Sequence, residues 1–269
     1  MKPDFLPHRL TAAQIDEAAH ALLHARAVRV RLAGLPAGCA PAVTEDAEAI
    51  CEAMADGFER PIGGWKVGCT DPGMPAKLGL ERPFCGQVPQ VLIYTSGASV
   101  VHSDLMRAVV EPEIVFQLGQ DLPPRVEPYS RAEILSALLA LYPSLEIPES
   151  RLLDDHPHGA MGMVADQGYA GRIVLGPEIR DWQNCDLSAQ SVAVAINGLI
   201  VAQGKTARAM GNPIEAVLWL ANARRQHDGL RAGQVISTGT LTGVIAVRPG
   251  DEVTADYGAL GKVLLFVRP

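Results

Sequence analysis

The sequence predicts an α+β protein, in which an α-rich N-terminal region precedes a mixed or antiparallel β core. Amphipathic segments with helix-capping residues occupy much of the first 90 residues, and short runs rich in Val, Ile and Leu follow from about residue 88. A chain of 269 residues suits one large domain, or one domain with a smaller companion. We therefore expect an α-rich region over residues 1–90 and a β-rich domain over residues 91–269.

Four helices are expected from capping residues and apolar periodicity. Thr11 to Gln14 has the form of a capping box, and apolar residues then recur on one face as far as Leu23. The other expected helices span Thr44–Phe58, Ser130–Leu141 and a segment that opens at Asn212-Pro213 and ends before Gly229. The segment Gly34–Gly38 is expected to be a loop.

The later part of the chain reads as short strands. The dipeptide Asn197-Gly198 lies between two apolar runs and is the strongest hairpin signal in the chain. The expected strands are Gln87–Ser96, Ala108–Leu118, Arg172–Gly176, Ser191–Ile196, Leu199–Gln203, Gln234–Thr238, Val244–Val247, Glu252–Ala255 and Lys262–Val267.

Composition argues against several classes of function. The formal net charge is −7 and no basic run of five or more residues occurs, so we expect no nucleic-acid partner. Met1–Phe5 lacks the apolar core of a signal peptide, and no apolar run approaches the roughly 20 residues of a membrane span, so no membrane partner is expected. The five cysteines are scattered and form no C-x-x-C pair, which indicates a reducing cytoplasm.

Two acidic residues in an apolar strand form the first candidate site. Glu111 and Glu113 flank Pro112, and on a strand they point to one face, about 7 Å apart. Carboxylate oxygens at that spacing can converge on Mg²⁺, whereas a solvated face of an edge strand is the simpler interpretation of the same pattern. Because proline donates no ladder hydrogen bond, Pro112 should lie at a sheet edge or a bulge.

Further candidates lie in three other segments. Glu146 sits among apolar residues after the expected third helix and could be a third carboxylate, whereas Glu149 is expected in a surface ion pair with Arg151. Lys66 lies in a glycine-flanked apolar strand, where its ammonium could pair with an anionic substrate oxygen or simply extend to the surface. The turn around Thr240 offers hydroxyl and N–H groups to a carboxylate ligand, but it does not match a P-loop.

Two other chemistries find little support. The run Asp154-Asp155-His156-Pro157-His158 looks like a metal-ligand cluster, but consecutive acids beside a proline are more typical of an exposed turn. The chain contains no G-x-S-x-G and no cysteine in a characteristic nucleophile motif, so a serine or cysteine hydrolase is not indicated.

Read in order, the motifs resemble the 2-keto-4-pentenoate hydratase / 2-oxo-3-hexenedioate decarboxylase group of the fumarylacetoacetate hydrolase superfamily. The resemblance covers most of the chain, from about Gly64 to the end. It is carried by G-x-K-V-G at Gly64–Gly68, E-x-E at Glu111–Glu113, L-E at Leu145-Glu146, A-D at Ala165-Asp166, Asn197-Gly198, G-x-P-x-x-A-V-x-W-L-A at Gly211–Ala221, G-x-x-I-x-T-G at Gly233–Gly239 and Gly250-Asp251.

The resemblance implies a mixed β-barrel-like roll as the catalytic domain, a homo-oligomer and a small 2-oxo acid as substrate. It places Glu111, Glu113 and Glu146 where the family binds Mg²⁺ or Mn²⁺, and Lys66 where it has a catalytic or substrate-binding lysine. It also places Thr240 near the substrate-binding turn. Asp166 falls in a segment that approaches the active site, where we expect it to position water or move a proton.

The implied activity is addition of water to a 2-hydroxy-2,4-dienoate through a metal-polarised enolate. Two departures from the pattern leave the reaction open. Pro83-Phe84-Cys85-Gly86 stands where such hydratases read P-D-F-G, and Gln167-Gly168-Tyr169 replaces a segment that usually holds Asn and Ser. Decarboxylation of 2-oxo-3-hexenedioate, hydrolysis of an acylpyruvate and a non-catalytic acid-binding role are the alternatives.

Overall fold

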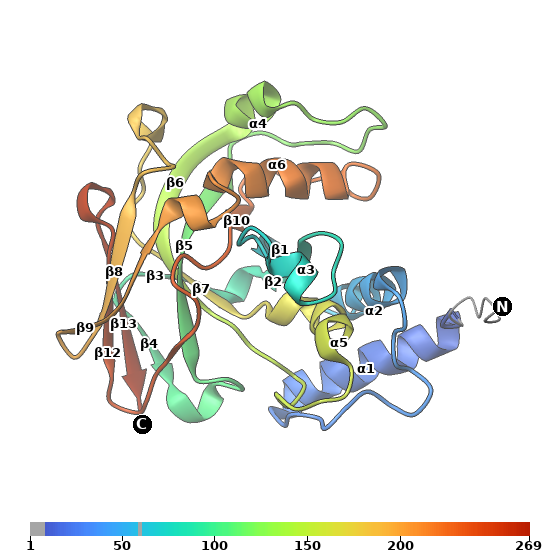
Figure 1. The fold of residues 1–269 in the computed structure, drawn as a ribbon. Helices are drawn as coiled ribbons and strands as arrows, with labels where there is room; N and C mark the ends of the chain where they lie inside the picture. The colour runs from blue at the N-terminus through green and yellow to red at the C-terminus, as the bar shows by residue number, and fades with distance from the viewer. Residues whose placement is uncertain (1–8, 59–60) are drawn as a thin grey trace.

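The computed structural model describes residues 9–58 and 61–269, as two β-sheets with the N-terminal helices on the side away from the smaller sheet (Figure 1). Residues Met1–Phe5, for which we expect no signal peptide, lie outside the described residues. Within the described ranges, no helix combines the length and apolar character that a membrane crossing requires.

The N-terminal helices form a small layer with its own apolar core. α1 (Ala12–Val28) begins at the expected capping box of Thr11 and Gln14, and it packs against α2 (Thr44–Asp56). Leu22 of α1 and Met54 of α2 are fully buried in this core, which also receives α5 (Gly159–Ala165). The first two expected helices are therefore confirmed, with the second ending two residues early.

The larger sheet is mixed and has eight strands. Its order is β2-β1-β10-β5-β6-β7-β3, with β11 beside β5; the pairs β1–β10 and β3–β7 are parallel and the others antiparallel. The strands are β1 (Ile62–Gly68), β2 (Phe84–Pro89), β3 (Ile93–Thr95), β5 (Val109–Leu118), β6 (Leu138–Ile147), β7 (Arg172–Leu175), β10 (Val235–Ser237) and β11 (Ile245–Ala246).

The smaller sheet has five strands in the order β4-β13-β12-β8-β9. These are β4 (Ala98–Val101), β8 (Ser191–Ile196), β9 (Leu199–Lys205), β12 (Glu252–Asp256) and β13 (Lys262–Arg268). The expected Asn197-Gly198 hairpin joins β8 to β9, with Asn197 at φ 52° and Gly198 at φ 80°. Side chains of the two sheets share one large apolar core, so the predicted α+β roll is confirmed.

Two predicted element boundaries are wrong. The third helix, α4 (Arg131–Ala137), stops before Leu138, and the apolar run that follows is β6 rather than the end of a helix. A fully buried strand and a buried helix are both continuous apolar runs in the sequence, so periodicity does not distinguish them. The expected strand Gln87–Ser96 is broken by a turn at Gln90–Leu92. Strands β1 and β2 lie before residue 90, so the β-rich part of the chain begins near residue 62. The domain boundary at residue 90 stays a prediction.

Pro112 lies on an inner strand, contrary to the expected sheet edge. β5 is flanked by β6 on one side and by β10 and β11 on the other. β10 pairs with residues 115–117 and β11 with residues 109–110, so Pro112 falls in the gap between them. There its carbonyl accepts a hydrogen bond from the N–H of Leu241 (2.9 Å). Because neither β10 nor β11 pairs with Pro112, the missing N–H of the proline removes no hydrogen bond with these two strands.

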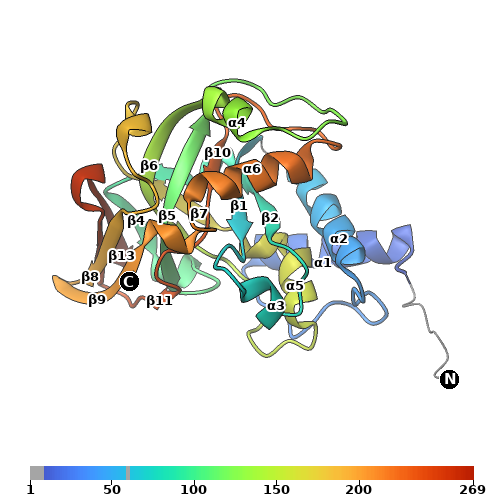
Figure 2. The same ribbon diagram turned by 45° about the horizontal axis from the view of Figure 1, so that its top comes forward.

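Helix α6 (Pro213–Arg224) connects the helical layer with the large sheet. Asn212 caps it by accepting a hydrogen bond from the N–H of Ile214 (3.0 Å), as expected. Figure 2 shows α6 beside β1, and the guanidinium of Arg224 lies 4.8 Å from the ring centroid of Trp65 on that strand. Arg224 also pairs with Glu52 of α2, which joins the two layers.

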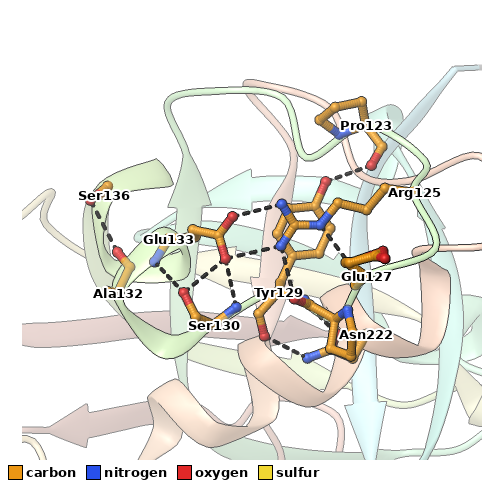
Figure 3. Close-up of polar contacts among 10 residues, drawn as sticks. Pro123, Arg125, Glu127, Tyr129, Ser130, Ala132, Glu133, Ser136 and Asn222 are labelled. Carbon is orange, nitrogen blue, oxygen red and sulfur yellow. Dashed lines mark hydrogen bonds and ion pairs between the residues drawn. The ribbon is translucent and has the colours of Figure 1, made fainter.

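The long connection between β5 and α4 is held by one arginine (Figure 3). The guanidinium of Arg125 donates to both carboxylate oxygens of Glu133 (2.6 and 2.9 Å) and lies 3.6 Å from the ring centroid of Tyr129. The hydroxyl of Tyr129 donates to the carbonyl of Pro123 (2.5 Å), and its N–H donates to Asn222 of α6 (2.8 Å). Residues 123–133 are thus tied to the helix that borders β1.

This arrangement predicts an acid-dependent contribution of Glu133 to stability. Hydrogen bonds from Arg125 and Ser130 lower the pKa of Glu133 from 4.5 to about 2. A carboxylate with a lowered folded-state pKa stabilises the protein above its unfolded pKa, and the contribution is lost as the pH falls toward the folded value. The difference in Tm between the wild type and Glu133→Gln should therefore shrink between about pH 4.5 and pH 2.

Thermal unfolding at a series of pH values checks this expectation. Glu127→Gln is the matched control, because Glu127 is exposed and contacts Arg125 through its backbone carbonyl. A Tm difference for Glu133→Gln that stays constant across this range would contradict the assignment.

Candidate metal centre

Strand register brings three glutamates to one face of the large sheet. Glu111 lies opposite Glu146 in the β5–β6 pair, and Glu113 follows two residues after Glu111 on the same face. Carboxylate oxygens of the three residues all lie within 4.8 Å of one another. The convergence depends on β6, whose first four residues are predicted as the end of a helix.

The same face carries Lys66, contributed by β1. Lys66 is in register with Ser237 of β10, which in turn is in register with Val115 of β5. Its Nζ lies 2.9 Å from Oε2 of Glu146 and 3.6 Å from Oε2 of Glu111. Burial acts to lower the pKa of Lys66, but the neighbouring carboxylates outweigh it and the pKa is raised. The lysine is therefore a buried ammonium rather than a surface group.

Hydrogen bonds hold one oxygen of Glu113 and leave the other free. Oε2 accepts from the hydroxyl of Ser237 (2.5 Å) and from the N–H of Gly239 (2.7 Å). Among the described residues, Oε1 of Glu113 and Oε1 of Glu146 have no hydrogen-bond partner, although both side chains are fully buried. Buried polar atoms without partners are uncommon, and at this position they mark room for a ligand.

The charges of the cluster fit a divalent cation. When all three glutamates are ionised, one ammonium leaves two negative charges uncompensated in a buried site. Burial raises the pKa of Glu113 and raises that of Glu146 well above its ordinary value, and Lys66 opposes both shifts. An all-oxygen donor set of this charge suits Mg²⁺ or Mn²⁺. The donor types, their spacing and the free oxygens therefore fit a metal ion.

A cavity of about 320 Å³ opens in front of the cluster. Lys66, Glu111 and Glu113 belong to its lining, together with Gly68, Phe84, Arg107, Tyr169, Arg208 and Thr240. Glu113 is fully buried and Glu111 is 8% exposed, so the cluster lies at the closed end. This volume is at the small end of the range for ligand pockets, which suits a small acid.

Phe84 occupies the place where the related motif has an acid. Its ring is nearly buried and packs so closely on Gly68 that a Cβ there would come within 2.2 Å of the ring. Cys85, the next residue along β2, points to the opposite side and lines a different cavity. This part of the site is therefore apolar, and the acid of the related motif is replaced by a benzyl group.

Thr240 lines the cavity but uses its hydroxyl within its own turn. Its Oγ1 accepts a hydrogen bond from the N–H of Gly243 (2.9 Å) and lies 3.2 Å from the carbonyl of the same residue. The turn therefore presents a fixed Thr240 side chain to the cavity, and its role in substrate binding stays a prediction.

Asp166 is not brought to the cavity. The backbone N–H of Arg151 donates to Oδ2 of Asp166 (2.7 Å), the Arg151 guanidinium binds Oδ1, and both side chains are fully buried. Burial raises the pKa of Asp166 to about 6, and Arg151 acts in the opposite direction. Both oxygens are thus engaged, and this geometry gives no support to the expected role in positioning water or moving a proton.

The neighbouring acidic residues also differ from expectation. Glu149 is 5% exposed and pairs with Arg172, so the expected surface ion pair with Arg151 is wrong. Arg151 turns instead toward Asp166, fifteen residues later. Sequence proximity does not decide such pairs, because the direction of each side chain depends on the fold.

The segment 154–158 behaves as the exposed turn that we expected. Asp154 is exposed and pairs with Arg31 (2.7 Å), and Nε2 of His158 accepts a hydrogen bond from the N–H of Leu35 (2.8 Å). Within residues 9–58 and 61–269, the three glutamates form the only metal-competent group of three or more acidic, His or Cys residues.

A strained segment forms one wall of the cavity. Gln167, Gly168 and Tyr169 have φ values of 55°, 56° and 60°, three successive residues in the left-handed region. Such backbone costs about 1–3 kcal/mol for each non-glycine residue and needs support from its surroundings. Gln167 supplies it, because its Oε1 accepts from the N–H of Gln87 (2.8 Å) and its Nε2 donates to the carbonyl of Cys51. The result is a fixed position for Tyr169 beside the ligand space.

A second cavity, of about 510 Å³, also borders β2, and Phe84 belongs to the lining of both cavities. It is bordered by Cys51, Cys85 and several charged residues that pair with one another, including Arg82 with Glu48 and Arg224 with Glu52. It holds none of the three converging glutamates, so the smaller cavity is the better candidate for chemistry.

Sequence reasoning missed Ser237 and Gly239 as supports of Glu113, and Arg107 and Tyr169 as cavity residues. The sequence predicts a polar turn around Thr240, but nothing in it indicates a glutamate from another strand as its partner. A single arginine before a strand carries no signal of its own. Ser237 and Gly239 emerge from their hydrogen bonds to Glu113, and Arg107 and Tyr169 from the lining of the cavity.

A curled mixed sheet with a buried acid–lysine cluster at the floor of a small cavity defines an enzyme for small molecules. The profile of the fumarylacetoacetate (FAA) hydrolase C-terminal family matches residues 66–267. The chain belongs to the fumarylacetoacetate hydrolase family.

Relatives within this family are hydratases and decarboxylases. The chain is 33% identical over 205 residues to a 2-keto-4-pentenoate hydratase of Paraburkholderia xenovorans, covering 76% of this chain and 75% of that one. It is 29% identical over 204 residues to a 4-oxalocrotonate decarboxylase of Pseudomonas putida, covering 75% and 76%. The structure of 4-oxalocrotonate decarboxylase from Pseudomonas putida G7, complexed with magnesium and adipate, superposes with a TM-score of 0.87 at 25% identity, covering 97% and 100%.

The geometry predicts that Asp166→Asn affects stability rather than the chemical step. Removing one partner of a buried ion pair leaves the other charge uncompensated, which costs about 3–5 kcal/mol. Denaturant unfolding should show this loss, while turnover per folded molecule at low temperature stays near that of the wild type. Asp228→Asn, at an exposed position, is the control. Unchanged stability with lost turnover would restore Asp166 to the catalytic machinery.

Proposed function

We propose that this chain is a divalent-metal-dependent lyase that adds water to a 2-hydroxy-2,4-dienoate, the enol form of a 2-oxo-enoate such as 2-keto-4-pentenoate. The observation that carries the proposal is the buried group of Glu111, Glu113 and Glu146, with two free oxygens, at the floor of the cavity. Relatives named 2-keto-4-pentenoate hydratase support the reaction, and the magnesium complex of the related decarboxylase supports the cofactor.

In this proposal the three glutamates hold Mg²⁺ or Mn²⁺. A bound ion would supply Lewis-acid polarisation at the 2-oxo acid end of the substrate. Ser237 and Gly239 keep Glu113 in a fixed orientation through its Oε2 and leave its Oε1 free to bind. Fixed orientation matters because a ligand set that must rearrange loses affinity and catalytic power.

Lys66 has a different task in the same site. Its Nζ lies at the cavity beside the glutamates, so the ammonium can stabilise negative charge on the 2-oxo oxygen or deliver a proton to the substrate. The ammonium also offsets the repulsion among the glutamates to which it is paired. Thr240 would present its turn to the substrate, as the resemblance implies.

Decarboxylation of 2-oxo-3-hexenedioate is the second candidate. Phe84 favours it, because the acid of the hydratase motif is absent and the ring makes this wall of the cavity apolar. The decarboxylase relative and its adipate complex support the same choice. Assays of both substrates with Mg²⁺, followed by ultraviolet absorbance and by release of carbon dioxide, separate the two reactions. Oxalate binding with Mg²⁺ but no turnover would favour a non-catalytic role.

The proposal includes a cytoplasmic homo-oligomer. All five cysteines lie in the described part of the chain and are unpaired, which supports a reducing compartment. Strand β9 is at the edge of the smaller sheet and exposes Leu199, Ile200 and Val201 by 50% or more. An apolar sheet edge of this kind is a site for pairing with another chain, which supports self-association.

Neutral replacement of a glutamate should remove metal binding without unfolding the protein. Glu113→Gln or Glu146→Gln takes away a buried charge, so the metal-free variants should be at least as stable as the wild type. In the wild type, Mg²⁺ or Mn²⁺ at 100 times Kd should raise stability by about 2.7 kcal/mol. Thermal unfolding with and without the ion should show this increase for the wild type and for Glu252→Gln, an exposed control. The Glu111→Ala and Glu113→Ala variants should lose turnover.

If either alanine variant keeps full turnover in the presence of a chelator, the metal proposal is wrong. The stability readout is independent of substrate choice, so it remains informative even if the physiological substrate differs from those assayed.

Replacement of Lys66 should separate catalysis from metal binding. Lys66→Met removes the ammonium but no metal ligand, so kcat should fall by roughly 10²- to 10³-fold. Mn²⁺ affinity, measured by calorimetry, should be retained or increased because the glutamates lose a competing positive charge. Lys262→Met, at an exposed position on β13, should leave both quantities unchanged. Full activity of Lys66→Met would remove Lys66 from the proposal.

A further inference from the structure

Hydration of a 2-hydroxy-2,4-dienoate requires a proton at the carbon farthest from the 2-oxo group. Water adds at C4 only after C5 has gained this proton and the double bond between C3 and C4 has become conjugated with the 2-oxo group. Lys66 and the glutamates form the buried end of the cavity, where the proposed function places the 2-oxo group. A donor for C5 is therefore expected in another part of the cavity.

Most of the remaining lining cannot supply this proton. Its apolar members are Met74, Leu78, Phe84, Pro148, Met163 and Val244. The carboxylate of Asp71 is paired with Arg208, with 3.1 Å between Oδ2 and Nη2, and the hydroxyl of Thr240 is used within its own turn. Two side chains with an acidic hydrogen remain, the thiol of Cys69 and the phenol of Tyr169.

The thiol of Cys69 is the weaker of these two candidates. Burial raises the pKa of Cys69 to about 11, and the negative charge of Asp71 adds to the rise. In the part of the chain that the structure describes, this thiol makes no hydrogen bond that would fix its direction. Tyr169, in contrast, is held both at its backbone and at its hydroxyl.

The backbone of Tyr169 is fixed at the end of the strained segment Gln167–Tyr169. Its N–H donates to the carbonyl of Asp166 (2.9 Å), and its own carbonyl accepts from the N–H of Glu149 (3.0 Å). The side chain of Gln167 holds the left-handed backbone by hydrogen bonds to two other segments. The ring of Tyr169 therefore lines the cavity from a rigid wall.

The hydroxyl of Tyr169 is held by a histidine. Nδ1 of His156 accepts a hydrogen bond from the N–H of His158 (3.2 Å), so neutral His156 carries its hydrogen on Nε2. That Nε2 lies 3.0 Å from the hydroxyl oxygen of Tyr169 and donates to it. Burial lowers the pKa of His156, so the ring stays neutral. The hydroxyl hydrogen of Tyr169 is not used in this bond and can be donated.

The surroundings of Tyr169 suit an acid that gives up its proton only to a substrate. Burial raises the pKa of Tyr169, so the phenol is the resting form, and the positive charge of Arg107 opposes the rise. Arg107 also lines the cavity, and its one carboxylate neighbour within 4.0 Å in the described ranges is Asp154, at 3.9 Å from Nε. The anion left after proton transfer would therefore have a positive charge and the N–H of His156 beside it.

The acid that is missing from β2 lies next to this segment. Phe84 stands where the related motif has an acid, and a Cβ on Gly168 would come within 2.6 Å of its ring. Gly168 directly precedes Tyr169. The phenol is thus supplied by the segment that packs on the apolar replacement.

We propose that Tyr169 is the acid that protonates C5 of the dienoate, and that His156 is a positioning residue that directs the phenolic hydrogen into the cavity. The inference rests on the proposed function, because it takes the 2-oxo end of the substrate to lie at the glutamates. A positioned general acid of this kind contributes roughly 10²- to 10⁴-fold to the rate.

The proton transfers balance. The phenol of Tyr169 gives its proton to C5, the double bonds shift to C3=C4 and C2=O, and the enol oxygen loses its proton to solvent. The tyrosinate then takes a proton from solvent water, so the enzyme returns to its first state. The product of this step is 2-oxo-3-pentenoate, to which water adds with its hydroxyl at C4 and its hydrogen at C3.

Two substrates that differ only in the position of one proton test the proposal. 2-Hydroxypenta-2,4-dienoate needs the proton at C5, whereas 2-oxo-3-pentenoate already has it. At saturating Mg²⁺, Tyr169→Phe should hydrate the dienoate roughly 10²- to 10⁴-fold more slowly than the wild type, and 2-oxo-3-pentenoate at close to the wild-type rate. In D₂O the wild type should exchange the C5 hydrogens of 2-oxo-3-pentenoate, followed by NMR, and Tyr169→Phe should lose this exchange.

Variants of His156 test its positioning role. His156→Leu should slow C5 exchange roughly 10- to 100-fold, because the tyrosinate loses a hydrogen bond to a charged oxygen. His156→Gln should restore part of the rate, since its amide N–H can replace that of Nε2. Tyr94→Phe on β3, outside the cavity, and Cys69→Ala, which removes the competing thiol, should both keep wild-type exchange.

Wild-type C5 exchange in Tyr169→Phe, or loss of exchange in Cys69→Ala alone, overturns the role of Tyr169 and leaves the proposed function intact. Equal slowing of both substrates in Tyr169→Phe also overturns it, because a residue that only maintains the cavity would affect both. Failure of the wild type to hydrate either substrate with Mg²⁺ contradicts the proposed function itself, and the assignment of Tyr169 falls with it.

Discussion

Burial of three carboxylates beside a single ammonium is the constraint on which the rest of this structure depends. Charged groups removed from water are costly unless they are paired, and three ionised glutamates leave two negative charges after Lys66 is counted. The fold compensates in part by fixing Glu113 with Ser237 and Gly239, but it leaves oxygens of Glu113 and Glu146 free. A site of this kind is less stable than an apolar core would be, so its presence argues for a bound cation.

The strand order and register of the large sheet bring the residues of this cluster together. β10 lies between β1 and β5, and the register across these strands aligns Lys66, Ser237 and Glu113 on one face. The antiparallel β5–β6 pair then adds Glu146 opposite Glu111. Pro112 is tolerated on an inner strand because its missing donor falls where β10 ends and β11 has not begun. The same interruption admits the Gly239–Gly243 turn to the edge of the cavity.

Charged residues of similar type have different roles around this cluster. Asp166 and Arg151 are as deeply buried as Glu113, yet they satisfy each other and serve the packing of the segment behind the cavity. Arg107 is near the surface and incompletely paired, which makes it available to a ligand. A charged side chain that is fully paired within the protein indicates a structural role, and one that is incompletely paired at a cavity indicates ligand binding. The ion-pair partners of a charged side chain are therefore more informative about its role than its burial.

The sequence by itself determined the elements whose signals are local. The capping boxes at Thr11 and Ser130, the Asn197-Gly198 hairpin and the pair Glu111/Glu113 on one strand face depend on residues within a few positions of one another, and each was predicted. Tertiary structure alone decided that the run after Ala137 is a strand, that Asp166 belongs to Arg151, and that Arg107 and Tyr169 share a cavity with the glutamates. One physical reason is that buried strands and buried helices are both continuous apolar runs in the sequence. The other is that strand order and register, across long stretches of chain, determine the partner of a charged side chain.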